Sequence, residues 1–252
     1  RGQMDAPVAI RLLKRAASDL RTTTWKPELE PQRHQKVAVV GSGPAGLTVA
    51  YDLVRKGYEV TVFEKQAIPG GMLALGIPDY RLPAEILQKE IQEILDLGIE
   101  LQTGVEFGKD ITLQDLGDQG YEAVFLGIGC QVGIPLEVPG AEAEGVLDAV
   151  KFLRELALRE EPQIGGRVAV IGGGDTAIDS ARSALRLGAK EVHLVYRRTE
   201  EEMPAHPEEI EAARAEGIKF HMLAAPREVL FKQGKVAGLV CQQMRLGEFD
   251  KS

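Results

Sequence analysis

One pattern of residues occurs twice in this chain, and this repeat constrains the fold more than any other feature. The first copy is KVAVVGSGPAGLTVAYDLVRKGYEVTVFEK (residues 36–65), and the second is RVAVIGGGDTAIDSARSALRLGAKEVHLVYRR (residues 167–198). Each copy reads as an apolar strand, a glycine-rich turn, a helix with periodic apolar residues and a second strand. Solenoid repeats have periods of roughly 20 to 50 residues, whereas the two copies here begin 131 residues apart. The repeat is therefore an αβ unit used twice. The sequence therefore predicts an α/β protein with two such units.

The two copies align through their turns and helices, and then with one inserted residue. Gly41 matches Gly172 at an offset of 131 residues, and the extra residue in the second copy places Glu64 opposite Tyr196. The first copy therefore ends in an acid, whereas the second ends in Tyr196, Arg197 and Arg198.

The first turn, GSGPAG, has the glycine spacing of a dinucleotide-binding fingerprint. Gly41 permits the tight turn, Gly43 lets the backbone approach a pyrophosphate, and Gly46 lets helix and strand pack closely. The N-terminus of the following helix offers unpaired N–H groups to phosphates. Glu64 closes the second strand, where a carboxylate can accept hydrogen bonds from ribose hydroxyls. These residues predict a Rossmann-like nucleotide site, and the pattern alone does not separate FAD from NAD.

The second turn, GGGDTA, predicts another pyrophosphate site. It carries Gly172 and Gly174, and Ala177 stands where a third glycine would allow close packing. Asp175 and Thr176 open the second helix. We interpret them as capping residues for its N–H groups, with the carboxylate also near a bound phosphate.

The end of the second strand is expected to decide which nucleotide this second site prefers. A carboxylate there would bind the 2'-hydroxyl of NAD and repel a 2'-phosphate, whereas Tyr196, Arg197 and Arg198 carry no such repulsion. Guanidinium groups match phosphate oxygens with forked donors, so the arginines favour NADPH, with NADH still possible. Tyr196 is a candidate to stack on the adenine. The alternative is that the arginines only pair with the acids at 200–202.

Composition excludes several classes of protein. A net charge of -8 argues against a general nucleic-acid surface, and no apolar run in the 252 residues is long enough to cross a bilayer. Cys130 and Cys241 are far apart, so the chain makes no CxxC redox centre, and the cytoplasm is the expected compartment. His193, His206 and His221 lack metal-ligand spacing, and we assign no metal. Asp179 and Arg182 are interpreted as a solvated helical pair.

The rest of the chain predicts further helices and strands around the two units. A helix is expected from Pro7 to Leu20, followed by an extended linker from Thr22 to Gln35. Between the copies we expect a loop, an amphipathic helix at 84–98 and a buried strand at 121–129. Short strands at 218–223, 228–233 and 235–246 follow, the last two joined as a hairpin through Gly234.

Taken together, these motifs resemble the flavin- and NADPH-binding β subunit (small subunit) of glutamate synthase and its relatives. VAVVGSGPAGL, GGMLALGIPDYRL, AVFLGIG, VIGGGDTAID and VYRRTEEEMPA occur in the family's order over essentially the whole chain. The family includes the NADPH-side module of dihydropyrimidine dehydrogenase and flavoprotein subunits of bifurcating transhydrogenases. The resemblance implies an NAD(P)H domain inserted into an FAD domain, here incomplete, after a short N-terminal helical extension. The expected domains are residues 1–36, 37–145 and 146–252.

The resemblance also implies which residues meet each cofactor. For FAD they are Gly41, Ser42, Gly43, Pro44, Ala45, Gly46, Glu64, Lys65, Gly70, Gly71, Val105, Gly127 and Gly129. For NADPH they are Gly172, Gly173, Gly174, Asp175, Thr176, Ala177, Tyr196, Arg197 and Arg198. Without the family, the alternative for the pair at 70–71 is an ordinary turn after a proline. Arg81 is either a flavin or partner contact or an exposed cation.

The implied activity is hydride transfer from NADPH to FAD, with no catalytic side chain, followed by electron transfer to iron–sulfur clusters or a partner subunit. In the family a cluster domain precedes this segment and further strands complete the FAD domain after it. The chain therefore looks truncated at both ends, and we expect it alone to bind FAD weakly. The expected partners are an iron–sulfur, amidotransferase or other electron-accepting subunit. The alternatives are an electron-bifurcating ferredoxin-linked flavoprotein subunit and a non-catalytic nucleotide-binding assembly module.

Overall fold

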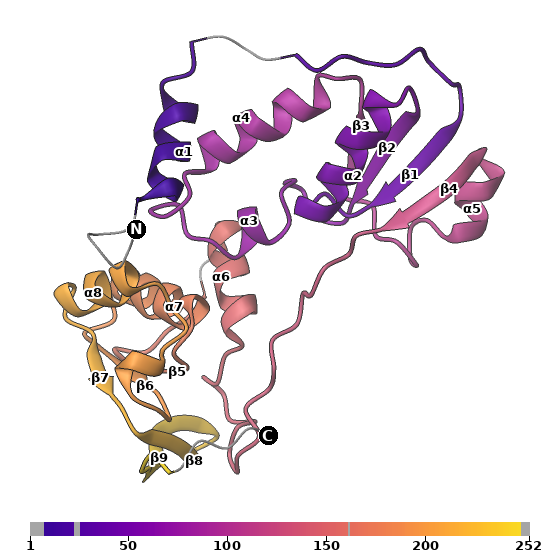
Figure 1. The fold of residues 1–252 in the computed structure, drawn as a ribbon. Helices are drawn as coiled ribbons and strands as arrows, with labels where there is room; N and C mark the ends of the chain where they lie inside the picture. The colour runs from indigo at the N-terminus through magenta and orange to yellow at the C-terminus, as the bar shows by residue number, and fades with distance from the viewer. Residues whose placement is uncertain (1–7, 23–25, 161, 248–252) are drawn as a thin grey trace.

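The structure of the protein is a computed structural model, which describes residues 8–22, 26–160 and 162–247 (Figure 1). In chain order its elements are α1 (Ile10–Asp19), β1 (Lys36–Val40), α2 (Pro44–Arg55), β2 (Glu59–Glu64), α3 (Met72–Leu75), α4 (Ala84–Leu95), β3 (Glu100–Thr103), α5 (Leu113–Asp118), β4 (Tyr121–Leu126), α6 (Ala149–Ala157), β5 (Arg167–Ile171), α7 (Asp175–Arg186), β6 (Glu191–Val195), η1 (Glu200–Glu202), α8 (Pro207–Ala215), β7 (Lys219–His221), β8 (Ala224–Lys232) and β9 (Lys235–Gln243). Figure 1 shows two bodies, with a long extended segment leading from β4 to the second body.

The first unit is a parallel sheet in the order β3-β2-β1-β4. β1 and β2 are almost entirely buried, as parallel strands covered on both faces usually are. One face packs on α2 and α4 through Val39, Ala50, Val62 and Ile99. The other face packs on the α5 region through a smaller cluster that includes Phe63.

The second unit is a parallel sheet in the order β5-β6-β7, with α7 and α8 packed against it. Ile178 and Leu194 are fully buried in the core between them. β5 alternates between exposed and half-buried residues, because only one face of this sheet is covered in the described residues. The repeat seen in the sequence is therefore a repeat in space.

The predicted alignment of the two copies is confirmed by strand register. Val40 pairs with Phe63 in the first unit, and Ile171 pairs with Val195 in the second. Phe63 is followed by Glu64 and Val195 is followed by Tyr196, so these two residues hold equivalent places.

The predicted hairpin is also confirmed. β8 and β9 pair antiparallel, with Lys232 opposite Lys235. Gln233 and Gly234 both have positive φ, at 55° and 79°, which is the geometry of the two-residue turns that suit twisted hairpins. The segment before α6 packs here, since Val229 N donates to the carbonyl of Pro139.

Two expectations about elements need correction. The strand at 121–129 was predicted to be buried, but β4 ends at Leu126 and all of its residues are exposed or half-buried. The reason is that β4 lies at the edge of its sheet, with a neighbour only on the β1 side in the described residues. The first helix begins at Ile10, and all its side chains are exposed. The predicted start at Pro7 lies outside the described residues.

The linker that precedes β1 is extended, as predicted, in the residues at 26–35. Its backbone is tied to the end of α2, because Glu30 N donates to Arg55 O and Arg33 N to Gly57 O, each at 2.8 Å. Across the described residues, none of the helices combines the length and apolar character that crossing a membrane requires.

Candidate functional site: two glycine turns facing helix N-termini

The first glycine turn joins β1 to α2 and leaves no room for a side chain at Gly41 or Gly46. A Cβ on Gly46 would lie 1.9 Å from the carbonyl oxygen of Gly41, and one on Gly41 would lie 2.4 Å from that of Gly127. Gly41 also has a φ of 100°, and its N–H donates to Phe63 O at 2.8 Å. Helix and strand therefore pack backbone to backbone, as the fingerprint requires. The first-turn N–H groups of α2 are left without helical partners.

Glu64 lies beside this turn, where it was predicted. Its side chain is buried, and Oε2 accepts hydrogen bonds from Ser42 N at 2.9 Å and Ser42 Oγ at 2.7 Å. Gln66 N donates to Oε1 at 2.8 Å. A carboxylate oxygen can accept more than one hydrogen bond, and Oε1 accepts only that of Gln66 among the described residues, so the group retains capacity for a ribose hydroxyl.

The pair at 70–71 is a turn that packs on the first glycine turn, so the two readings of it are compatible. Gly70 N donates to Ser42 O at 3.1 Å and to Ser42 Oγ at 3.2 Å. A Cβ on Gly71 would lie 2.7 Å from the Cα of Gly43, and φ is 118° and 56° at the two positions. Only glycine brings these backbones so close together.

The other predicted FAD residues lie at different depths around the turn. Gly127 N donates to Val40 O at 2.8 Å, and Val105 N donates to Glu64 O at 2.9 Å, so both are at the carboxyl edge of the sheet. Gly129 is exposed with a φ of 65°. Lys65 is instead turned to the surface, where it pairs with Glu106 at 2.6 Å.

The second glycine turn has the same construction with one substitution. Gly172 N donates to Val195 O at 3.0 Å, as Gly41 N does to its own second strand. A Cβ on Gly172, whose φ is 139°, would lie 3.1 Å from the Cβ of Ala177, which is buried. The methyl group therefore fits where a third glycine was expected.

Tyr196 closes one side of this second turn. A Cβ on Gly173 would lie 2.6 Å from the Tyr196 ring, so the ring rests on the turn. The Tyr196 hydroxyl donates to Glu202 O at 2.8 Å, which fixes the ring.

Arg197 and Arg198 are exposed and form no ion pair within the described residues. Two of the three acids proposed as alternative partners are engaged elsewhere. Glu200 pairs with Arg214, and Glu202 accepts from the Thr199 hydroxyl at 3.1 Å. The alternative, in which the arginines only pair with the acids at 200–202, is not found.

The capping interpretation of Asp175 is wrong. α7 starts at Asp175 as predicted, but its N-cap is Gly174 and no side chain caps it. The Asp175 carboxylate instead accepts from His206 N at 3.1 Å and lies 2.9 Å from His206 Nδ1. Burial raises the pKa of Asp175, but the His206 hydrogen bonds and Arg81 outweigh it and lower the pKa overall. Thr176 is exposed beside it on the first turn.

The interpretation of Asp179 and Arg182 as a solvated pair is also wrong. Both side chains are buried, and they do not pair with each other. Asp179 binds Arg81 at 2.7 Å, whereas Arg182 binds Glu209 and, at 2.7 Å, Glu216. Arg81 is therefore not an exposed cation. Sequence spacing pointed to neighbours on one helix, and nothing local signals a partner 98 residues away.

Within the described residues no three histidine, cysteine or acidic side chains gather as metal ligands. His193 Nδ1 lies 2.8 Å from His221 Nε2 on the sheet of the second unit. Cys130 and Cys241 are both free and exposed, and partial burial raises the pKa of the Cys241 thiol.

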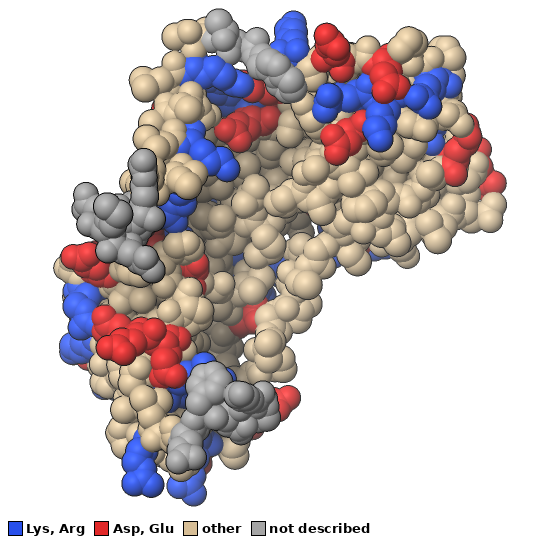
Figure 2. All heavy atoms as spheres, in the orientation of Figure 1, with Lys and Arg blue, Asp and Glu red and all other residues tan. Residues whose placement is uncertain are grey.

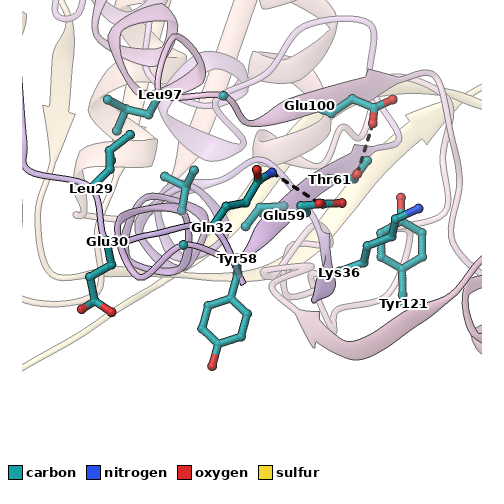
Figure 3. Close-up of a pocket in the computed structure, with 14 residues that line it drawn as sticks. Leu29, Glu30, Gln32, Lys36, Tyr58, Glu59, Thr61, Leu97, Glu100 and Tyr121 are labelled. Atoms are coloured by element: carbon teal, nitrogen blue, oxygen red, sulfur yellow. Dashed lines mark hydrogen bonds between the residues drawn. The ribbon is translucent and has the colours of Figure 1, made fainter. Parts of the chain in front are cut away.

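A cavity of about 470 Å³ lies at the end of the first sheet where its strands begin, opposite the glycine turn (Figure 3). It is lined by the residues that begin β1, β2 and β3, namely Lys36, Glu59 and Glu100, and by linker residues such as Leu29. In open α/β sheets ligands bind outside the carboxyl ends of the strands, so this cavity is not part of the candidate site.

The comparisons with known proteins agree with this geometry. The family model described as pyridine nucleotide-disulphide oxidoreductase matches residues 35–247. The chain is 42% identical over 279 residues to the NADP(+)-dependent formate dehydrogenase subunit beta of Moorella thermoacetica, covering 100% of this chain and 39% of that protein. It is 38% identical over 240 residues to the glutamate synthase [NADPH] small chain of Escherichia coli, covering 90% of this chain and 51% of that protein. The chain thus spans two fifths to half of these relatives.

A solved structure supports the same architecture. Mycobacterium tuberculosis FprA in complex with NADPH superimposes with a TM-score of 0.69 over 84% of this chain and 70% of that chain, at 19% identity. At this identity the likeness shows the fold alone. The predicted α/β fold with two dinucleotide-binding units is confirmed, as is the similarity to glutamate synthase small chains.

Proposed function

The chain belongs to the pyridine nucleotide-disulphide oxidoreductase family, and from this premise we propose that it binds FAD at the first glycine turn and NADPH at the second, and carries out hydride transfer between them. The observation that carries the proposal is the contrast between Glu64 and Tyr196 at equivalent places, the second followed by two arginines without ion-pair partners in the described residues. One fold is used twice, with different selectivity for the ribose.

The first turn supplies what an FAD diphosphate requires. The glycines leave the α2 N-terminus open, and its N–H groups and dipole favour a diphosphate there. Glu64 is held by Ser42 beside that position and would accept from the ribose hydroxyls. The turn at Gly70 and Gly71, packed on Gly43, would lie along the flavin side of the site.

The second turn supplies the same diphosphate cradle at the α7 N-terminus. Arg197 and Arg198 follow the strand end at which the 2'-substituent of the adenosine ribose would lie. Their forked donors suit a 2'-phosphate, and a carboxylate is lacking at the position equivalent to Glu64. The Tyr196 ring, fixed by Glu202, forms the wall of the site beside Gly173.

When bound, the two cofactors supply the redox chemistry themselves, a hydride passing from the nicotinamide to the flavin. This chain's residues bind and orient them: the two turns hold the diphosphates, and the acid and the arginines fix the riboses. Such a transfer needs alignment of two rings, and no general acid–base pair is required of the protein.

We extend the proposal to the organisation and partners of the protein. Residues 37–145 would form the FAD domain and residues 146–252 the NAD(P)H domain, after an N-terminal extension. The names of the formate dehydrogenase and glutamate synthase relatives denote subunits of larger enzymes. By analogy, electrons would leave the flavin for iron–sulfur clusters or for an electron-accepting partner subunit. This step lies outside the two turns described above.

The test is anaerobic reduction of the flavin-loaded protein by NADPH and, separately, by NADH. Rapid loss of the oxidised flavin absorption with NADPH and slow loss with NADH is the expected result. Rapid reduction by NADH alone would overturn the assignment of the arginines. No reduction by either nucleotide would overturn hydride transfer and leave a binding module.

A further inference from the structure

A partly buried cluster of charges joins the two units. Arg81 comes from the loop between α3 and α4 of the first unit, and it meets three carboxylates of the second unit. Its guanidinium lies 2.7 Å from Asp179, 3.4 Å from Glu209 and 3.8 Å from Asp175. We call these four residues the Arg81 cluster.

The centre of the cluster is shielded from water, whereas the side chains of Glu209 and Asp175 at its rim are 21% and 34% exposed. Only 19% of the Arg81 side chain and 4% of the Asp179 side chain are exposed. Burial lowers the pKa of Arg81, but Asp179, Glu209 and Asp175 outweigh it and raise the pKa overall, so the guanidinium stays charged. Buried pairs of this kind add little to stability compared with apolar packing, because desolvation offsets their attraction. What such pairs do provide is a specific geometry between the elements that they join.

Tyr80, the residue before Arg81, reinforces the same contact. Its ring lies against two guanidiniums of α7, with centroid distances of 4.5 Å to Arg182 and 4.1 Å to Arg186. Both arginines are held in turn by Glu216. Burial, followed by the nearby Asp179 carboxylate, raises the pKa of Tyr80 to about 12. The two-residue tip of the loop is therefore docked on the side of α7.

Apolar packing beside the cluster is incomplete. A cavity of about 320 Å³ lies between the loop of the first unit and helices α6 and α7, lined by Ile77, Leu82, Leu153 and Leu187 among others. Figure 2 shows the molecule hollowed between its two bodies on one face. A junction with such gaps does not fix one orientation by shape alone. The directional contacts of Arg81 and Tyr80 are what can fix it.

The cluster also lies next to both glycine turns. Asp175 is the first residue of α7, directly after the second turn, and Asp179 is one helical turn further on. On the other side, the segment that leads to Arg81 begins at the 70–71 turn, which packs on the first glycine turn. Arg81 therefore connects the segments that would hold the two diphosphates.

The charge of Arg81 acts at the same place. The carboxylate of Asp175 stands on the first turn of α7, where it would repel a bound diphosphate. Arg81 and His206 both lie against that carboxylate. The positive charge of Arg81 reduces the repulsion at this helix N-terminus, and His206 engages the same carboxylate through its backbone N–H and its ring.

We propose that Arg81 is a positioning residue for the hydride transfer proposed above: it clamps α7 to the flavin-side loop, and so sets the orientation of the two nucleotide sites while neutralising Asp175. The inference rests on the proposed function. It predicts that losing Arg81 harms reduction of the flavin by NADPH more than it harms flavin binding or folding.

The test compares Arg81→Gln, Arg81→Lys, Asp179→Asn and the double variant Arg81→Gln/Asp179→Asn, each in the flavin-loaded protein. Arg11→Gln is the matched control, because Arg11 pairs with Glu208 of the second unit from α1 but is exposed. For each protein, flavin content, thermal midpoint, limiting rate of flavin reduction and half-saturating NADPH concentration are measured. Reduction by dithionite reports whether the flavin itself remains competent.

The expected result is a separation of stability from rate. Arg81→Gln lowers the limiting rate by roughly 100-fold, as a displacement of about 1 Å can, and raises the half-saturating NADPH concentration. The double variant regains the thermal midpoint, because no buried carboxylate is left unpaired, but not the rate. Arg81→Lys recovers part of the rate, and dithionite reduces every variant equally.

Two outcomes are decisive against the inference. If the double variant is reduced by NADPH at the rate of the unaltered protein, Arg81 serves folding only and the proposed function stands. If the unaltered protein is reduced by neither nucleotide, the proposed function fails and the role of Arg81 in it fails too. Should Arg81→Gln not fold, the double and lysine variants decide between these outcomes.

Discussion

Glu64 and Tyr196 occupy the same place in two copies of one unit, each directly following the residue that pairs with the last residue of the first strand. The backbone around them is alike, since Gly41 N reaches Phe63 O at 2.8 Å and Gly172 N reaches Val195 O at 3.0 Å. The side chains are opposite in character. An acid held by Ser42 marks one turn, and a tyrosine followed by Arg197 and Arg198 marks the other.

The first prediction concerns these arginines. In Arg197→Ala/Arg198→Ala the half-saturating NADPH concentration for flavin reduction should rise by about 10- to 100-fold, because charge-assisted hydrogen bonds contribute about 1.5–3 kcal/mol. The value for NADH should change little. Arg214→Ala is the control, since Arg214 pairs with Glu200 nearby. Equal loss with both nucleotides would contradict a role in 2'-phosphate recognition.

The second prediction concerns the third glycine of the first turn. Gly46→Ala places a methyl group 1.9 Å from a backbone oxygen, so strand and helix must separate. We expect the free energy of unfolding to fall by about 3 kcal/mol and bound flavin to be lost, measured by denaturant unfolding and by absorbance. Gly117→Ala is the control, because its Cβ meets nothing within 4 Å and it lies in α5. That change should stabilise the protein by about 0.5–1 kcal/mol.

The third prediction concerns the acid of the first turn. In Glu64→Gln one carboxylate oxygen becomes an amide nitrogen, which donates and cannot accept. The side chain can then no longer accept from both Ser42 and Gln66 as the carboxylate does. We expect FAD affinity, measured by titration of the flavin-free protein, to fall by about 10-fold, with a loss of about 1–2 kcal/mol in stability. Glu106→Gln, which removes surface pairs with Lys65 and Lys109, should change neither. Unaltered FAD affinity in Glu64→Gln would remove Glu64 from the site.

The features predictable from sequence are those whose cause is local. The turns at Gly41 and Gly172 follow from residue size and backbone freedom over a few positions, and the register that aligns Glu64 with Tyr196 follows from strand periodicity. For this reason the sequence predicts the two units, their glycine turns and the hairpin at Gly234 as the structure has them.

The features that could not be predicted depend on what packs against a residue from far along the chain. Asp179 and Arg182 are one helical turn apart, so their spacing indicated a mutual pair. Instead Asp179 pairs with Arg81 of the other unit, and Arg182 pairs with Glu209 of α8. Similarly, Asp175 was expected to cap its own helix, but its carboxylate lies 2.9 Å from His206 Nδ1 instead. β4 was expected to be buried because its residues are apolar, yet burial depends on neighbouring strands that its own sequence does not specify.

The last prediction concerns the pH dependence of stability. Hydrogen bonds from Arg186, opposed by partial burial and aided by Arg182, lower the pKa of Glu216 from 4.5 to about 2. A carboxyl group whose pKa is depressed in the folded state stabilises that state above its unfolded pKa, and the contribution disappears as the pH falls through the folded pKa. The window for Glu216 therefore runs from about pH 4.5 down to about pH 2.

Glu216→Gln should accordingly reduce the free energy of unfolding by about 1 kcal/mol at neutral pH, a value discounted because solvent screens this partly exposed group. The difference from the unaltered protein should shrink as the pH falls below about 4.5 and vanish near pH 2, followed by urea unfolding at each pH. Glu211→Gln is the control, because Glu211 is exposed on α8, the helix that Glu216 caps, and has no ion pair in the described residues. A destabilisation by Glu216→Gln that stays constant from pH 7 to pH 3 would mean that the contacts of Glu216 act through packing and not through its charge.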